Sequence, residues 1–198
     1  MNEKNLISRS NFLRNGISHL VEYFSGSVSK LLKESAGKTV IPLHRPPGAV
    51  DDELEFLSNC TRCDLCIEAC PHKALTRADA KFGAAVGTPM IVPEDNPCYM
   101  CADYPCIAVC PEPALSLENS LVMGTAHIIN SKCYAHAGQI CDYCYDSCPL
   151  KDEAIIMDNK KPMVFEKNCT GCGLCEYYCP VPGNAILIIP KRKFSGES

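Results

Sequence analysis

The sequence predicts an α+β protein of two small domains, one nested inside the other, with an amphipathic helix at the N-terminus. Three observations lead to this prediction: an unusual number of cysteines, their grouping into repeats, and a helical apolar pattern near the start of the chain. The 198 residues include 16 cysteines but only eight tyrosines and six phenylalanines, and tryptophan is absent. So few large side chains cannot stabilise two small domains by burial alone, and we therefore expect the cysteines to cross-link the fold.

Residues 1–36 are predicted to form a docking helix. Apolar residues recur there at the spacing of one helix face, and they are Leu13, Ile17, Leu20, Val21, Phe24, Val28, Leu31 and Leu32. Lys and Arg are scarce on the opposite face. This pattern favours docking on the protein's own body or on a partner subunit over binding to a membrane surface.

The stretch ISRSNFLRNG at residues 7–16 is one arginine short of a twin-arginine export signal, since Ser10 stands where a second arginine would be. No continuous apolar h-region follows it. We therefore expect a cytoplasmic protein, either free or held peripherally at the inner membrane through a partner, with a periplasmic location as the alternative. No stretch approaches the ~18 to 20 apolar residues of a membrane-spanning helix.

The segments that flank the cysteine region are predicted to be irregular. Residues 37–55 include IPLHRPPGA, whose prolines cannot sustain a helix, so this segment is expected to be an extended, proline-rich strap. Residues 191–198 are expected to form a flexible, solvated tail. The formal net charge of −4 and the scattered basic residues argue against nucleic acid as a partner.

The cysteines fall into four groups of four, and each group ends in C-x3-C-P. The first and fourth groups are CTRCDLCIEACP and CTGCGLCEYYCP, whereas the second and third carry longer gaps of C-x4-C and C-x7-C. The groups are Cys60, Cys63, Cys66 and Cys70; Cys98, Cys101, Cys106 and Cys110; Cys133, Cys141, Cys144 and Cys148; and Cys169, Cys172, Cys175 and Cys179. The chain is therefore four diverged copies of one unit.

The spacing C-x2-C-x2-C-x3-C-P is the ligand pattern of bacterial ferredoxins that hold [4Fe–4S] clusters. Three thiolates of such a loop reach one cluster, and the fourth cysteine, about one helical turn further on, ligates the other cluster of a pair. Zinc is the main alternative, but zinc sites have no use for a third cysteine at this spacing. Disulfides would require an oxidising compartment, which the missing export signal disfavours. The sequence thus predicts four [4Fe–4S] clusters, with all sixteen cysteines as iron ligands.

Ligand exchange allows two pairings of the groups, nested or sequential. We favour nesting, because the two regular groups are the outermost and the two irregular groups lie between them. An outer ferredoxin-like domain would then comprise residues 56–80 and 160–190, with an inner one at residues 81–159. The corresponding ligand sets are Cys60, Cys63, Cys66 and Cys179; Cys169, Cys172, Cys175 and Cys70; Cys98, Cys101, Cys106 and Cys148; and Cys133, Cys141, Cys144 and Cys110.

Smaller features complete the picture of these domains. Each C-x3-C stretch is expected to be a short helix, and MVFEKN and NAILIIP are expected to be strands. His136 lies within the C-x7-C gap, but sixteen thiols already satisfy four clusters, so a ligand role is not expected. For His44 a core or surface position is the expectation, and most tyrosines are expected to pack around the clusters.

The runs RPPGAVDDELEFLSNCTRCDLCIEACP, GTPMIVPEDNPCYMCADYPCIAVCP and CTGCGLCEYYCP resemble the ferredoxin-type proteins of the MauM/NapG group over roughly residues 45–190. These are associated with methylamine dehydrogenase and periplasmic nitrate reductase systems. The N-terminus is similar to that of NapF-type proteins. The resemblance implies the four-cluster fold.

No nucleophile with a base at motif spacing, phosphate-binding loop or dinucleotide fingerprint is apparent, so we expect an electron carrier or relay subunit without its own catalytic site. It would pass single electrons between a redox enzyme and a quinone-linked or other donor or acceptor. Redox-enzyme or membrane-complex subunits are the expected partners, docked through the N-terminal helix and an acidic surface. The alternative is a maturation or assembly factor for a metalloenzyme.

Overall fold

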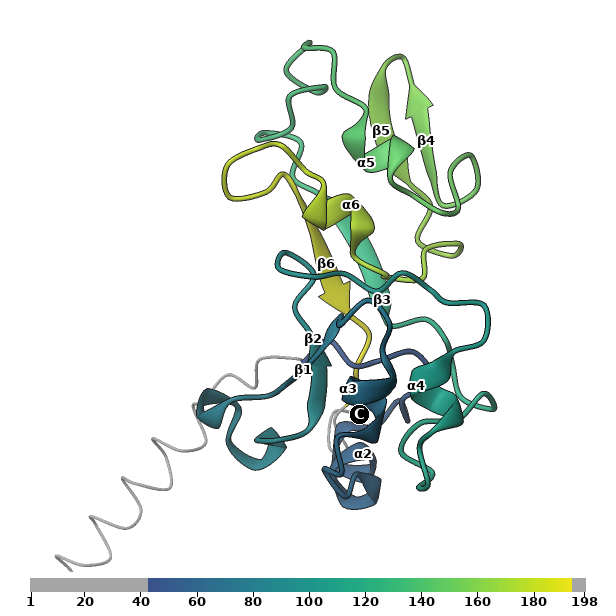
Figure 1. Ribbon diagram of the computed structural model, residues 1–198. Coiled ribbons are helices and arrows are strands. Elements are labelled where there is room, and N and C mark those ends of the chain that lie inside the picture. The colour runs from purple at the N-terminus through teal and green to yellow at the C-terminus, as the bar shows by residue number, and fades with distance from the viewer. Residues whose placement is uncertain (1–42, 194–198) are drawn as a thin grey trace, which may run out of the picture. The chain divides into compact units, whose positions relative to one another are not determined.

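The computed structural model describes residues 43–193, in which short helices and strands alternate (Figure 1). The predicted N-terminal helix, the start of the strap and residues 194–198 lie outside this range. The described chain consists of a first module, residues 43–122, and a second module, residues 123–193. In neither module is there a helix long and apolar enough to cross a membrane.

The first module holds the first two cysteine groups. Strands β1 and β2 form an antiparallel pair with Leu75 opposite Ile91, and a bridge between Ala49 and Leu115 joins the two ends of the module. In chain order its elements are α2 (Glu53–Asn59), α3 (Leu65–Ala69), β1 (Leu75–Arg77), the 3₁₀ segment η1 (Ala80–Ala85), β2 (Pro89–Ile91) and α4 (Pro105–Ala108).

The second module repeats this plan with longer strands. The outer strands β3 and β6 pair antiparallel with Ala126 opposite Ile188, and the hairpin of β4 and β5 lies between them in sequence. The elements are β3 (Gly124–Ile128), α5 (Tyr143–Asp146), β4 (Ile155–Asp158), β5 (Lys161–Val164), α6 (Leu174–Tyr177) and β6 (Ile186–Pro190). Each module thus closes its first segment on its last, with a hairpin between two cysteine loops.

The predicted local elements are present. In every group a helix of four or five residues begins one residue before the third cysteine and ends before the fourth, at α3, α4, α5 and α6. NAILIIP contains β6, whereas only the first two residues of MVFEKN belong to a strand, the end of β5. These elements are too short to be stable alone, so their stability must come from what holds the cysteine loops together.

The predicted nesting is wrong, because the two modules are consecutive. The bridge between Ala49 and Leu115 encloses groups one and two, and the pairing of β3 with β6 encloses groups three and four. Residues 56–80 plus 160–190 and residues 81–159 are therefore not separate domains. The irregular gaps of the middle groups are local loop extensions, and a loop extension does not change which strand closes a module.

The strap and the tail also differ from expectation. The predicted strap, residues 37–55, ends early because α2 begins at Glu53, where Asp52 caps it by accepting the N–H of Glu55 at 2.9 Å. Lys193 donates its N–H to Asp51 O at 3.0 Å and accepts that of Glu53 at 2.9 Å. Arg192 and Lys193 of the predicted flexible tail are therefore anchored to the first module, and Lys191 donates its N–H to Met123 O of the second module at 2.9 Å.

The two modules share a core. Cys172 and Leu174 of the second module pack in the same buried cluster as Phe56, Ile91 and Ile107 of the first. Between the modules, Cys98 donates its N–H to Cys172 O at 2.9 Å. The loop that carries the fourth cysteine group therefore completes the first module.

Candidate iron–sulfur centres

Four cavities in the structure are each lined by four cysteines, and we name them sites A to D. Site A has Cys60, Cys63, Cys66 and Cys110; site B has Cys70, Cys98, Cys101 and Cys106; site C has Cys148, Cys169, Cys172 and Cys175; site D has Cys133, Cys141, Cys144 and Cys179. Their empty volumes are similar, ≈ 360, 370, 390 and 340 Å³ with open solvent included. Each of the sixteen cysteines lines one of these four cavities.

The ligand sets predicted from nesting do not occur. The fourth cysteine of each group lies in the cavity of a partner group, but the partners are neighbours in sequence. Cys110 lines site A, where Cys179 was expected, and Cys70 lines site B, where Cys148 was expected. Cys148 lines site C instead of Cys70, and Cys179 lines site D instead of Cys110. This pairing follows directly from the consecutive modules.

The loops of the first and fourth cysteine groups share an unusual backbone conformation. In the fourth group Gly171 and Gly173 have φ of 70° and 93°, and the equivalent residues of the first group, Arg62 and Asp64, have φ of 58° and 64°. Non-glycine residues adopt this left-handed region at a cost of roughly 1–2 kcal/mol. Two non-glycine residues of the first loop adopt this strained conformation, which indicates that the loop must wind tightly to surround the cavity.

Backbone N–H groups point at several of the sulfurs. At site B the N–H of Ala74 lies 3.3 Å from Cys70 Sγ, and that of Met100 lies 3.5 Å from Cys98 Sγ. At sites C and D the corresponding donors are Ala126 to Cys169 Sγ and Ala185 to Cys179 Sγ, both at 3.4 Å. Such donors stabilise the negative charge of cluster-bound thiolates.

Burial disfavours the charged form of these thiols in the absence of iron. Desolvation, followed by the charges of neighbouring cysteines, raises the pKa of Cys66 and of Cys144 to about 12. Desolvation likewise raises the pKa of Cys106 to about 11. A thiolate must form before it can bind iron, so metal binding at these sites is coupled to proton release.

The cavities fit a cubane cluster, in which each thiolate binds a different iron atom and the four sulfurs surround a body rather than a point. Within residues 43–193, no three His, Cys, Asp or Glu side chains are arranged to share a single ion. The cavity walls are mainly apolar, and at site B they include His72 and Tyr99, whose rings stack with centroids 4.2 Å apart. His136 instead approaches Pro162 O at 3.4 Å.

The four sites follow one another in the order A, B, C, D. Cys66 of site A and Cys106 of site B are close enough to interact electrostatically, as are Cys144 of site D and Cys175 of site C. Sites B and C meet at the hydrogen bond between Cys98 and Cys172. The junction between modules therefore lies between the two middle sites.

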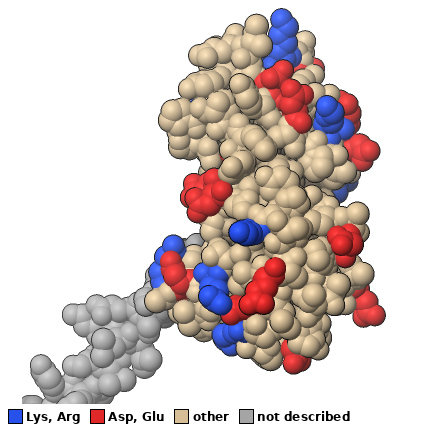
Figure 2. Space-filling model, in the orientation of Figure 1, with Lys and Arg blue, Asp and Glu red and all other residues tan. Residues whose placement is uncertain are grey.

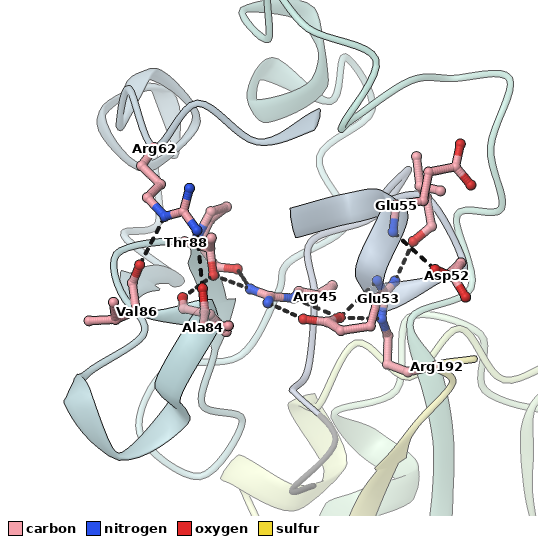
Figure 3. Close-up of polar contacts among 12 residues, drawn as sticks. Arg45, Asp52, Glu53, Glu55, Arg62, Ala84, Val86, Thr88 and Arg192 are labelled. Atoms are coloured by element: carbon pink, nitrogen blue, oxygen red, sulfur yellow. Dashed lines mark hydrogen bonds and ion pairs between the residues drawn. The ribbon is translucent and has the colours of Figure 1, made fainter. Parts of the chain in front are cut away.

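Two buried features were missed at the sequence level. Arg45, Glu53 and Arg192 form an ion-pair network beside site A (Figure 3). His44 is buried, and desolvation lowers its pKa to about 4 although a backbone contact with Gly171 opposes this. The only available signal was a charged pair, HR, within the apolar and proline-rich run IPLHRPPGA.

Comparison with known proteins agrees with this geometry. Residues 59–114 match the 4Fe-4S dicluster domain family, a range within the first module, and residues 166–182 match a 4Fe-4S binding domain family. The chain is 35% identical to the methylamine utilization ferredoxin-type protein MauM of Methylorubrum extorquens, covering 93% of this chain and 90% of that protein.

Two relatives from Escherichia coli extend the comparison. Ferredoxin-type protein NapG is 38% identical, with 77% of this chain and 73% of NapG covered. Ferredoxin-type protein NapF is 35% identical, with 69% of this chain and 80% of NapF covered. Together with the paired four-cysteine cavities, these similarities show that the chain belongs to the MauM and NapG family of ferredoxin-type 4Fe-4S electron-transfer proteins.

Proposed function

We propose that this protein binds four [4Fe–4S] clusters, one in each of sites A to D, and relays single electrons between a redox enzyme and a quinone-linked or other donor or acceptor. The observation that carries the proposal is the set of four similar cavities, each lined by four cysteines. When bound, the clusters would supply reversible one-electron chemistry.

The chain's own residues would determine how that chemistry is used. The sixteen cysteines hold the sites in a fixed order, and the N–H groups of Ala74, Ala126 and Ala185 stabilise negative charge on the sulfurs. The mainly apolar walls would limit the access of water to the clusters. The hydrogen bond from Cys98 N–H to Cys172 O would provide a direct bonded connection between sites B and C.

Iron and sulfide analysis of anaerobically purified protein tests the cofactor content. We expect about sixteen of each per chain, together with low-temperature EPR signals on reduction. Zinc without labile sulfide would contradict the proposal.

Substitution of the exchanged cysteines tests which residues share a site. Cys110→Ala should damage the cluster held by Cys60, Cys63 and Cys66, and Cys179→Ala should damage the one held by Cys133, Cys141 and Cys144. EPR of the two variants should therefore lose signals from different modules. A loss from the second module in Cys110→Ala would instead support the nested arrangement.

Partner docking remains a prediction. On the face shown in Figure 2, acidic and basic side chains are interleaved over the lower part and along the top and right side of the upper part, whereas the left side of the upper part is uncharged. That face offers no continuous acidic patch, so a partner that binds there would rely mainly on uncharged surface. The docking helix and the cytoplasmic location depend on residues outside the described range.

A further inference from the structure

A buried group of three charged side chains lies in the first module. Glu53 sits between Arg45 and Arg192 and forms an ion pair with each, at 2.9 Å in the case of Arg192 (Figure 3). The exposed fractions of the side chains of Arg45, Glu53 and Arg192 are 1%, 6% and 3%. Two arginines against one glutamate leave one uncompensated positive charge in the interior.

Hydrogen bonds connect the network to the residues around it, although Arg192 Nη2 has only its ion pair with Glu53 and no hydrogen-bond partner among the described residues. Arg45 Nη1 donates to Thr88 Oγ1 and to Pro89 O, each at 2.7 Å. Arg192 Nη1 donates to Val50 O at 2.6 Å. Asp51, whose charge also acts on Arg192, lies closer to the surface and pairs with Lys193 at 3.7 Å. Such fixed geometry prevents the guanidinium groups from turning toward water.

Phe56 separates the charge from site A. The guanidinium carbons of Arg45 and Arg192 lie 4.5 and 5.5 Å from the centroid of its ring. The same ring lines site A, and so does Pro89, whose carbonyl accepts from Arg45. The uncompensated charge is therefore one aromatic ring away from the site.

Site A is distinct from the other sites in this respect. Across residues 43–193, no Lys, Arg, Asp or Glu lines site B, C or D. The wall of site A also contains Arg62, Asp64 and Glu112, but these are partly exposed, and Asp64 pairs with Arg77 at 2.6 Å. Solvent screens such charges far more than buried ones.

We propose that the Arg45–Glu53–Arg192 network raises the reduction potential of site A, so that an electron taken up by the protein is most stable at site A, the first of the four sites in the order A, B, C, D. The inference rests on the proposed function, since it requires a cluster at site A. Reduction there adds one electron and one negative charge, supplied by a low-potential one-electron donor through the neighbouring site, and no bond forms or breaks. A nearby positive charge favours the more negative state.

Four variants test the proposal in the full-length protein. Arg192→Met removes the uncompensated charge and leaves the Arg45–Glu53 pair, whereas Arg192→Lys keeps the charge. Glu53→Gln increases the positive charge. Lys193→Met removes the same unit of charge from the adjacent residue, whose side chain is 73% exposed. Reduction is followed by EPR in an anaerobic potentiometric titration, and the site A signal is identified by its loss in Cys63→Ala.

We expect Arg192→Met to lower the site A potential and leave sites C and D unchanged. At an effective dielectric constant of about 20, the equilibrium constant of reduction should fall on the order of tenfold, about 59 mV for a one-electron couple. Glu53→Gln should raise the site A potential, whereas Arg192→Lys and Lys193→Met should change that potential little. If Glu53→Gln does not fold, the contrast between Arg192→Met and Arg192→Lys decides.

An unchanged site A potential in Arg192→Met protein with full iron content would overturn the inference. So would an equal shift in Lys193→Met, or one shared by all four sites. The iron and sulfide content of the unmodified protein tests the proposed function separately. Failure of the proposed function can therefore be distinguished from failure of the inference about the site A potential.

Discussion

At the scale of single residues, burial determines the protonation of His44. Its side chain lies in the interior, and neither ring nitrogen has a hydrogen-bond partner that meets normal geometry among the described residues. Desolvation lowers its pKa from 6.5 to about 4, so the ring is neutral at physiological pH. In the unfolded chain the same ring would take up a proton near its ordinary pKa.

This difference predicts acid sensitivity. Between pH 6.5 and pH 4 the unfolded state binds more protons, so stability falls as the pH falls through that range, by at most about 3.4 kcal/mol. His44→Asn should flatten this part of the profile. The rate of cluster loss at pH 5 and pH 7, followed by visible absorbance, measures the effect.

The exposed His127 provides the control. His127→Asn should keep the pH dependence of the unmodified protein. An identical pH profile in the His44 variant would show that another group is responsible for the acid sensitivity.

At the scale of elements, the close approach between the fourth cysteine loop and β3 depends on glycine. A Cβ added to Gly171 would lie 2.4 to 2.6 Å from backbone atoms of Gly124, which cannot move without disturbing the pairing of β3 with β6. Gly183 has nearly the same φ, 69° against 70°, but nothing lies within 4 Å of its added Cβ. An alanine at either position would carry similar backbone strain, but only the alanine at position 171 would also overlap with neighbouring atoms. A comparison of the two variants therefore distinguishes backbone strain from steric overlap.

Gly171→Ala should destabilise the protein more than Gly183→Ala. The latter should cost only the left-handed strain, roughly 1–2 kcal/mol, whereas the former should also displace Cys172 and reduce occupancy of site C. Iron content and thermal unfolding of the two variants provide the comparison. Equal effects would indicate that the loop can move away from β3.

At the scale of the whole molecule, the shared core couples the two modules. Leu174 belongs to α6 of the second module, yet it packs among the buried residues of the first. Sites B and C also face each other across the Cys98 and Cys172 backbone contact. Neither module buries its apolar surface fully without the other.

Leu174→Ala should therefore lower the stability of both modules together. A buried leucine truncated in this way typically costs about 2–5 kcal/mol, and EPR signals from both modules should disappear over one thermal transition. Leu117→Ala, at a residue whose exposed fraction is 64%, is the matched control and should have little effect. Independent loss of the second module would show that the modules fold separately.

The sequence by itself predicted those features that depend only on the spacing of residues close together in the chain. The cysteine spacings predicted the sixteen cavity-lining residues, and C-x3-C predicted the short helices, because three ligands and one helical turn lie within about ten residues of chain. The exchange of the fourth cysteine was also predicted, since a helix turns that residue away from its own loop.

Only the tertiary structure decided which groups share a cavity and where the buried charge lies. Pairing depends on which distant segments close each module, and the bridge of Ala49 with Leu115 and the ladder of β3 with β6 have no local signal of comparable strength. Arg192 follows β6 in a basic run that suggests a solvated tail, yet the antiparallel path of β6 returns it to Glu53, 139 residues earlier in the chain. Long-range closure is a property of the folded chain, and it makes this tail residue part of the surroundings of site A.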